Sequence, residues 1–72
     1  MAKKIDKLVR MANQIADFFR PYDEAEAVSG IQEHIRAFWT RGMREELLAF
    51  AARGGEGLQP RVRLAIDGMR AK

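Results

Sequence analysis

The chain has 72 residues, a formal net charge of +3 and no cysteine. This length allows one small domain, residues 1–72, whose core supplies little stability beyond what ordering the chain costs. The lack of cysteine excludes disulfides, disfavours a metal site and fits a reducing compartment. We therefore expect marginal stability in isolation, with docking onto a larger partner raising it.

The first predicted helix covers Ile5 to Phe19. With about 100° between successive helical residues, its apolar stripe contains Ile5, Leu8, Val9, Ala12, Ile15, Ala16 and Phe19. Met11 and Phe18 lie at one shoulder and widen the apolar arc beyond what one neighbouring helix covers. These two side chains either pack on a second neighbour or remain available to a partner.

A second helix is predicted from Glu24 to Trp39. Pro21 ends the first helix, because the residue before proline is pushed out of the α region, and Asp23 with Glu26 matches a capping box. The apolar stripe consists of Ala27, Val28, Ile31, His34, Ile35, Phe38 and Trp39. Gly30 weakens a helix interior by about 1 kcal/mol. A kink or restart at this glycine is one alternative; we favour one continuous helix.

Three residues of this stripe have less obvious roles. Periodicity assigns Phe38 to the core and leaves Trp39, at the helix end, open between the core and a partner contact. His34 lies at the edge of the stripe, and we expect a packed histidine with satisfied ring nitrogens. It forms no catalytic dyad with Glu33, because neighbouring helical residues point about 100° apart.

Thr40 can cap a third helix, predicted from Arg41 to Arg53, with the stripe Met43, Leu47, Phe50 and Ala51. Gly54 is expected at the C′ position in a left-handed conformation. The glycine-rich run that it starts lacks the lysine and the preceding strand of a phosphate-binding loop.

Pro60 suits the first turn of a fourth helix, whose stripe contains Val62, Ala65, Ile66 and Met69. The pattern as a whole predicts an all-α fold, a small bundle of three to four short helices. Four apolar side chains lie off the stripes: Met11, Phe18, Leu48 and Leu64. Either irregular packing absorbs them, or some of them form a partner surface.

Thirteen bases and ten acids are interspersed, and only the two ends are locally basic. This favours a solvated basic surface over a phosphate-binding face. A small basic helical nucleic-acid-binding or regulatory protein remains the alternative. No apolar run is long enough to span a membrane, and the Met-Ala-Lys-Lys start lacks the apolar segment of a signal peptide. We expect a cytoplasmic protein that binds neither nucleic acid nor membrane.

The stretch Glu33–Arg44 holds the only tryptophan, the only histidine and three arginines. Arginine beside aromatic and methionine side chains is typical of binding anchors as well as of cores. From this stretch and the off-stripe positions we predict a partner-binding set and no catalytic, cofactor-binding or metal-binding residue. The set is Met11, Phe18, His34, Trp39, Met43, Arg44, Leu48 and Leu64.

Several motifs in this order resemble a known family. They are Leu8 to Ala16 followed by Phe18 and Phe19, His34-Ile35-Arg36 with Phe38 and Trp39, Met43-Arg44 with Leu47-Leu48, and the late Gly57-Leu58. The chain resembles the delta subunit of NAD-dependent formate dehydrogenases over nearly its whole length.

The resemblance implies a non-catalytic accessory subunit that supports the assembly or stability of a cytoplasmic complex, which oxidises formate to carbon dioxide. It implies that the complex carries a molybdenum or tungsten cofactor, iron–sulfur clusters and FMN, and reduces NAD. These groups would belong to the larger subunits, so this chain would bind none of them, in agreement with its lack of cysteine. The resemblance implies those larger subunits as partners, and we expect the catalytic subunit to be the one that this chain contacts.

Overall fold

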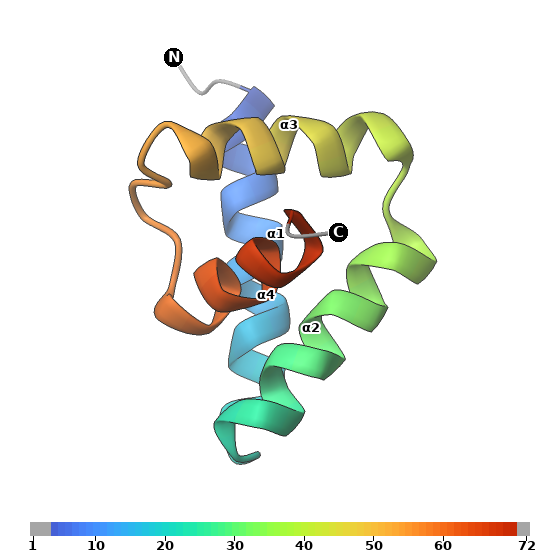
Figure 1. Cartoon of the computed structure of the whole chain (residues 1–72), viewed down its shortest axis with the longest axis vertical. Coiled ribbons are helices and arrows are strands. Elements are labelled where there is room, and N and C mark those ends of the chain that lie inside the picture. Colours follow the sequence, from blue (N-terminus) through green and yellow to red (C-terminus); the bar gives the residue numbers. More distant parts are fainter. Residues whose placement is uncertain (1–3, 71–72) are drawn as a thin grey trace.

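A computed structural model describes residues 4–70. Within this range the chain forms four helices: α1 (Lys4–Phe18), α2 (Glu24–Phe38), α3 (Arg41–Ala52) and α4 (Pro60–Arg70). In the view of Figure 1, α1 runs along the long axis, α3 crosses it near one end, α4 lies in front and α2 leans away to one side. The predicted all-α bundle of three to four short helices is confirmed, with four helices.

The helix ends follow the capping signals in the sequence. The Asp23 carboxylate accepts a hydrogen bond from the Glu26 backbone N–H (2.9 Å), and the Thr40 hydroxyl accepts one from the Met43 N–H (3.2 Å). Each bond satisfies a donor that the first helical turn leaves without a partner. These local signals fix where α2 and α3 begin.

The end of α3 is a Schellman motif. The Gly55 N–H donates to the Phe50 carbonyl (3.0 Å) and the Gly54 N–H to the Ala51 carbonyl (3.1 Å). Gly54 has a φ of +118°, a backbone conformation that residues with a Cβ rarely adopt. The prediction of a C′ glycine at this position is confirmed.

Gly30 lies inside α2, which continues through it without a break. A Cβ at this position would overlap the ring of Phe19, the residue just beyond the end of α1. The glycine therefore allows close approach of an aromatic ring from the neighbouring segment. This packing offsets the poor helix propensity that suggested a kink.

The four helices share one hydrophobic core, in which α2 packs mainly against α4. Its buried members are Leu8, Ala12, Ala16, Ile31, Ile35, Trp39, Leu47, Leu58, Val62, Ala65 and Ile66. Most of these residues belong to the predicted stripes. Phe38 was expected among them, and that expectation is wrong, because its side chain is 74% exposed.

The loop between α3 and α4 is held against α1 by polar side chains. Asn13 Nδ2 donates to the Gly57 carbonyl (2.9 Å), and the Gln59 N–H donates to Asn13 Oδ1 (3.0 Å). Gln59 Nε2 also donates to Asp17 Oδ1 (3.0 Å), which accepts a second bond from Arg20 (2.9 Å). The Gln59 hydrogen bond, followed by that of Arg20, holds the pKa of the Asp17 carboxyl below its ordinary value.

No helix in the described part of the chain is both long and apolar enough to cross a membrane.

Candidate functional site

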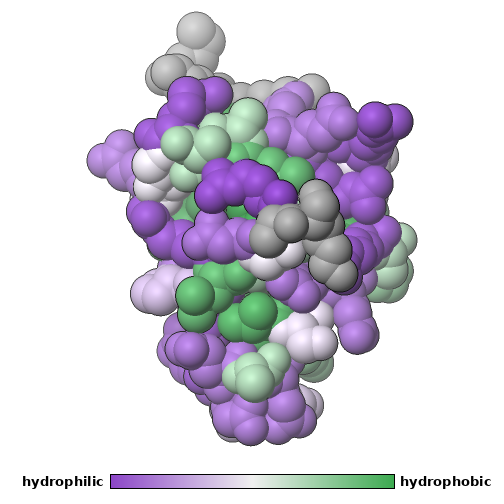
Figure 2. All heavy atoms as spheres, viewed as in Figure 1, coloured by the Kyte–Doolittle hydropathy of each residue, from purple (hydrophilic) through white to green (hydrophobic). Residues whose placement is uncertain are grey.

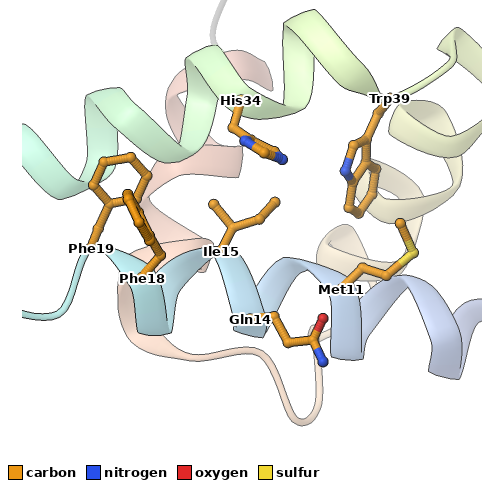
Figure 3. A pocket seen from close by; sticks show the side chains of 7 residues that line it. All are labelled: Met11, Gln14, Ile15, Phe18, Phe19, His34 and Trp39. Carbon is orange, nitrogen blue, oxygen red and sulfur yellow. The ribbon is translucent and has the colours of Figure 1, made fainter.

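An open groove of about 410 Å³ lies between α1 and α2. Its lining residues are mainly apolar and come from both helices and from the residues at their ends: Met11, Gln14, Ile15, Phe18, Phe19, His34 and Trp39. We call it the aromatic groove. In Figure 3 α4 lies behind α1 and α2, so the groove opens on the side of the molecule opposite α4.

Helical spacing accounts for the α1 wall of the groove. Met11, Ile15 and Phe18 follow one another at intervals of four and three residues, which places them on one face of a helix. Figure 3 shows Met11 and Ile15 rising from this face toward α2, with Phe18 and Phe19 near the end of the helix. The wide apolar shoulder of the first helix therefore borders an open space instead of a second neighbour.

Trp39 closes the other end of the groove. It is the C-cap of α2, with an extended backbone (φ −92°, ψ 144°), and its N–H donates to the Ile35 carbonyl (3.0 Å). Its side chain is only 6% exposed and belongs to the core cluster. In Figure 3 the indole reaches from the end of α2 toward Met11. Trp39 thus packs the core and forms one wall of the groove.

Two exposed phenylalanines flank the groove. Phe18 is 70% exposed, and its ring meets that of Phe19 edge-on, with centroids 5.0 Å apart. Phe38 packs its ring against the imidazole of His34, 4.7 Å between centroids. The expectation that His34 is packed in the bundle is wrong, because the residue is exposed. α2 leans away from α1 toward its C-terminal end, and His34 and Phe38 near that end are both exposed.

The opposite side of the molecule differs in character. Figure 2 shows the α4 side, where hydrophilic side chains cover most of the surface and hydrophobic ones appear in small areas. Leu64 lies on α4 with 43% of its side chain exposed, and it lines neither the aromatic groove nor the cleft described next.

A second cleft, of about 490 Å³, lies where α2, α3 and α4 meet. Arg44 and Leu48 line it, and both are partly buried. Met43 packs against the core near the start of α3 and lines neither cleft. The structure therefore brings Met11, Phe18, His34 and Trp39 together in one groove and places the other predicted partner-binding residues elsewhere.

Phe38 is the surface residue that periodicity missed. It was assigned to the core because it shares a stripe with Ile31 and Ile35. The signal that points to its exposure is its place at the last residue of α2, directly before a second large aromatic side chain. Only Trp39 of this adjacent pair is buried.

The groove has few groups for chemistry. Among the described residues that line it, His34 is the only titratable one and none carries a carboxylate. In residues 4–70 no three histidine or acidic side chains gather where they could hold a metal ion. Exposed apolar grooves on small proteins are typical of contacts with other proteins.

The fold and the groove thus define a small all-α protein with an apolar surface of the kind that binds another protein. The family model of the NADH-dependent formate dehydrogenase delta subunit, FdsD, matches residues 7–66. The chain belongs to this family. No curated protein and no solved structure matches the chain.

Proposed function

We propose that this chain is a non-catalytic accessory subunit of a cytoplasmic, NAD-dependent formate dehydrogenase complex and supports its assembly or stability. Membership of the delta-subunit family supports a place in such a complex, with larger subunits as partners. The catalytic subunit is the partner we propose first. The observation that carries the docking part of the proposal is the exposure of Phe18 and Phe38 beside the aromatic groove.

The rings of Phe18 and Phe38 are exposed by 70% and 74% in the chain alone. Burial of a phenylalanine side chain stabilises a contact by about 1.5–3 kcal/mol. Each ring can therefore supply about tenfold or more in affinity if a partner covers it. The aromatic groove, which Phe18 and His34 line and whose His34 contacts Phe38, offers room for an apolar side chain of that partner.

We also propose that the molybdenum or tungsten cofactor, the iron–sulfur clusters and the FMN are held by the larger subunits. This chain lacks the cysteine thiolates that hold iron–sulfur clusters. We assign it no step of formate oxidation. Its contribution is a surface that stabilises the larger subunits or assists their assembly.

Co-purification with the larger formate dehydrogenase subunits tests this function. Phe18→Ala combined with Phe38→Ala should reduce the recovered complex strongly, while the helicity of the free chain stays unchanged because both side chains are exposed. Leu64→Ala, a matched change at an exposed apolar residue of α4, should reduce it far less. Full co-purification of the double variant would refute docking through the aromatic groove.

A further inference from the structure

The second cleft is lined by arginine side chains from two helices. Arg36 of α2 and Arg41 and Arg44 of α3 border it, with Glu45, Leu48 and Met69. We call it the arginine cleft. Three positive charges and one negative charge leave an excess of two positive charges in a space of about 490 Å³.

Within residues 4–70, only one of these arginines has a carboxylate partner. Arg41 Nε lies 3.0 Å from Glu45 Oε2, whereas the guanidinium groups of Arg36 and Arg44 have no ion-pair or hydrogen-bond partner within residues 4–70. Most other arginines of the described chain, such as Arg20 and Arg70, engage an acid or a backbone carbonyl. As far as residues 4–70 are concerned, the arginine cleft therefore presents two guanidinium groups without a partner.

The floor of the cleft is apolar and orients Arg44. Arg44 also borders a small hollow lined by Leu47, Leu48, Ile66 and Met69. A partly buried arginine lays its methylene stem on such a surface and keeps the charged end in solvent. Its guanidinium is thus held near the cleft, and less side-chain entropy is lost when it binds.

We propose that the arginine cleft binds an acidic segment of a larger formate dehydrogenase subunit, a deduction that rests on the function proposed above. Carboxylates of that segment pair with Arg36 and Arg44, because a guanidinium matches a carboxylate with two parallel hydrogen bonds. An apolar side chain between the carboxylates packs on Leu48 and Met69. The partner sequence is therefore acidic with an apolar residue among the acids.

Two features favour this occupant over nucleic acid. Because Glu45 pairs with Arg41, the cleft leaves only two guanidinium groups for a ligand, which suits a short segment with two carboxylates better than a continuous chain of phosphates. Leu48 and Met69 would gain nothing from a phosphate backbone, whereas a protein segment can cover them.

The location of the arginine cleft also fits a protein partner. Arg36 and Arg41 flank Trp39 in sequence, and Trp39 forms a wall of the aromatic groove. One partner can thus contact both surfaces around the α2–α3 corner.

The test measures affinity of the full chain for the complex of larger subunits at two salt concentrations. Arg36→Gln combined with Arg44→Gln should weaken binding about tenfold near 50 mM salt and much less near 500 mM, because salt screens exposed charges. Arg53→Gln is the matched control, since Arg53 is an exposed arginine outside the cleft. It should stay within about twofold of the wild type.

Arg36→Gln alone leaves the apolar floor intact and should still weaken binding severalfold. Carbodiimide coupling identifies the anion: the amine introduced by Arg36→Lys should form an amide with a partner carboxylate, and mass spectrometry should find it in an acidic peptide. The inference would be overturned if, at low salt, the variant with both arginines changed to glutamine bound the complex as tightly as Arg53→Gln does. It would also be overturned if the introduced lysine coupled to no acidic peptide. A third contradicting result would be a double-glutamine variant that loses binding to a random oligonucleotide while its binding to the complex stays unchanged.

The outcomes separate this inference from the proposed function. If the Phe18 and Phe38 changes abolish binding while the arginine changes do not, the arginine cleft proposal fails and the accessory role stands. If the wild-type chain does not bind the larger subunits at all, the proposed function and the arginine cleft proposal both fail.

Discussion

Substitution of Gly30 by alanine tests how α2 is seated against the end of α1. The new Cβ would meet the Phe19 ring, with Cε1 only 2.5 Å away, far inside van der Waals contact. Phe19 does not move freely, because its ring packs edge-on against Phe18 (5.0 Å) and Tyr22 (5.4 Å). The ring must shift and lose part of these contacts.

The expected magnitude follows from opposing effects. Replacing glycine by alanine inside a helix stabilises by about 0.8–1 kcal/mol. Overpacking costs about 1–3 kcal/mol, and each disturbed aromatic pair adds up to about 1 kcal/mol. Together these effects span about 0–4 kcal/mol, so we expect Gly30→Ala to destabilise the chain by about 2 kcal/mol. For a chain of this size, each kcal/mol lowers the midpoint of thermal unfolding by about 4–8 °C.

Gly42→Ala is the matched control, because a Cβ at Gly42 in α3 meets nothing within 4 Å. This variant should be neutral or stabilised by up to about 1 kcal/mol. Circular dichroism during heating and urea titration measures both variants. Combined with Phe19→Ala, Gly30→Ala should no longer destabilise, since the obstructing ring is gone. Equal shifts of the same sign in both glycine variants would refute the packing argument.

Three further predictions concern the core, the end of α3 and acid stability. Trp39→Ala should reduce the free energy of unfolding by about 3–5 kcal/mol, because the side chain is 6% exposed; full helicity of this variant would show that Trp39 serves only the groove. Gly54→Val should destabilise by about 1 kcal/mol or more in urea titration, because φ is +118°; unchanged stability would mean that α3 ends differently. Asp17 stabilises the fold above the ordinary pKa of 3.8, and this contribution should be lost as the pH falls through the lower folded pKa. Asp17→Asn should flatten that part of the pH dependence, and an unchanged acid limb would contradict it.

Much of the fold could be predicted from short-range signals. Asp23, Thr40 and Gly54 mark helix ends through hydrogen bonds to residues only a few positions away, and Pro60 marks the start of α4 through its fixed φ. All four lie at the helix ends that the sequence predicted. Apolar periodicity likewise identified most of the core. These features depend on local geometry, which a single sequence contains.

The surface around the aromatic groove could be predicted only in part. The shoulder on α1 was visible as an apolar arc too wide for one neighbour. Phe38 was misjudged because it is the last residue of α2, where a place on the stripe does not ensure that the core covers the side chain. The sequence left Trp39 open between the core and a partner contact, and the structure buries it. His34 was misjudged because the lean of α2 away from α1 is a tertiary feature.

Contacts between distant residues were also beyond the sequence. Asn13 binds the backbone of Gln59, 46 positions away, and nothing in the local pattern of either residue indicates the other. The role of Gly30 is similar, since it depends on the ring of Phe19 arriving from another segment. Such pairings arise from the packing of whole helices.

The central claim is that the aromatic groove faces a larger subunit of the formate dehydrogenase complex. A photoactivatable benzophenone amino acid at the position of Phe38 tests it most directly, with the same group at the position of Leu64 as the matched control. We predict that irradiation of the assembled complex links position 38 to a larger subunit in high yield and position 64 only weakly. Efficient linkage from position 64 with none from position 38 would contradict the account.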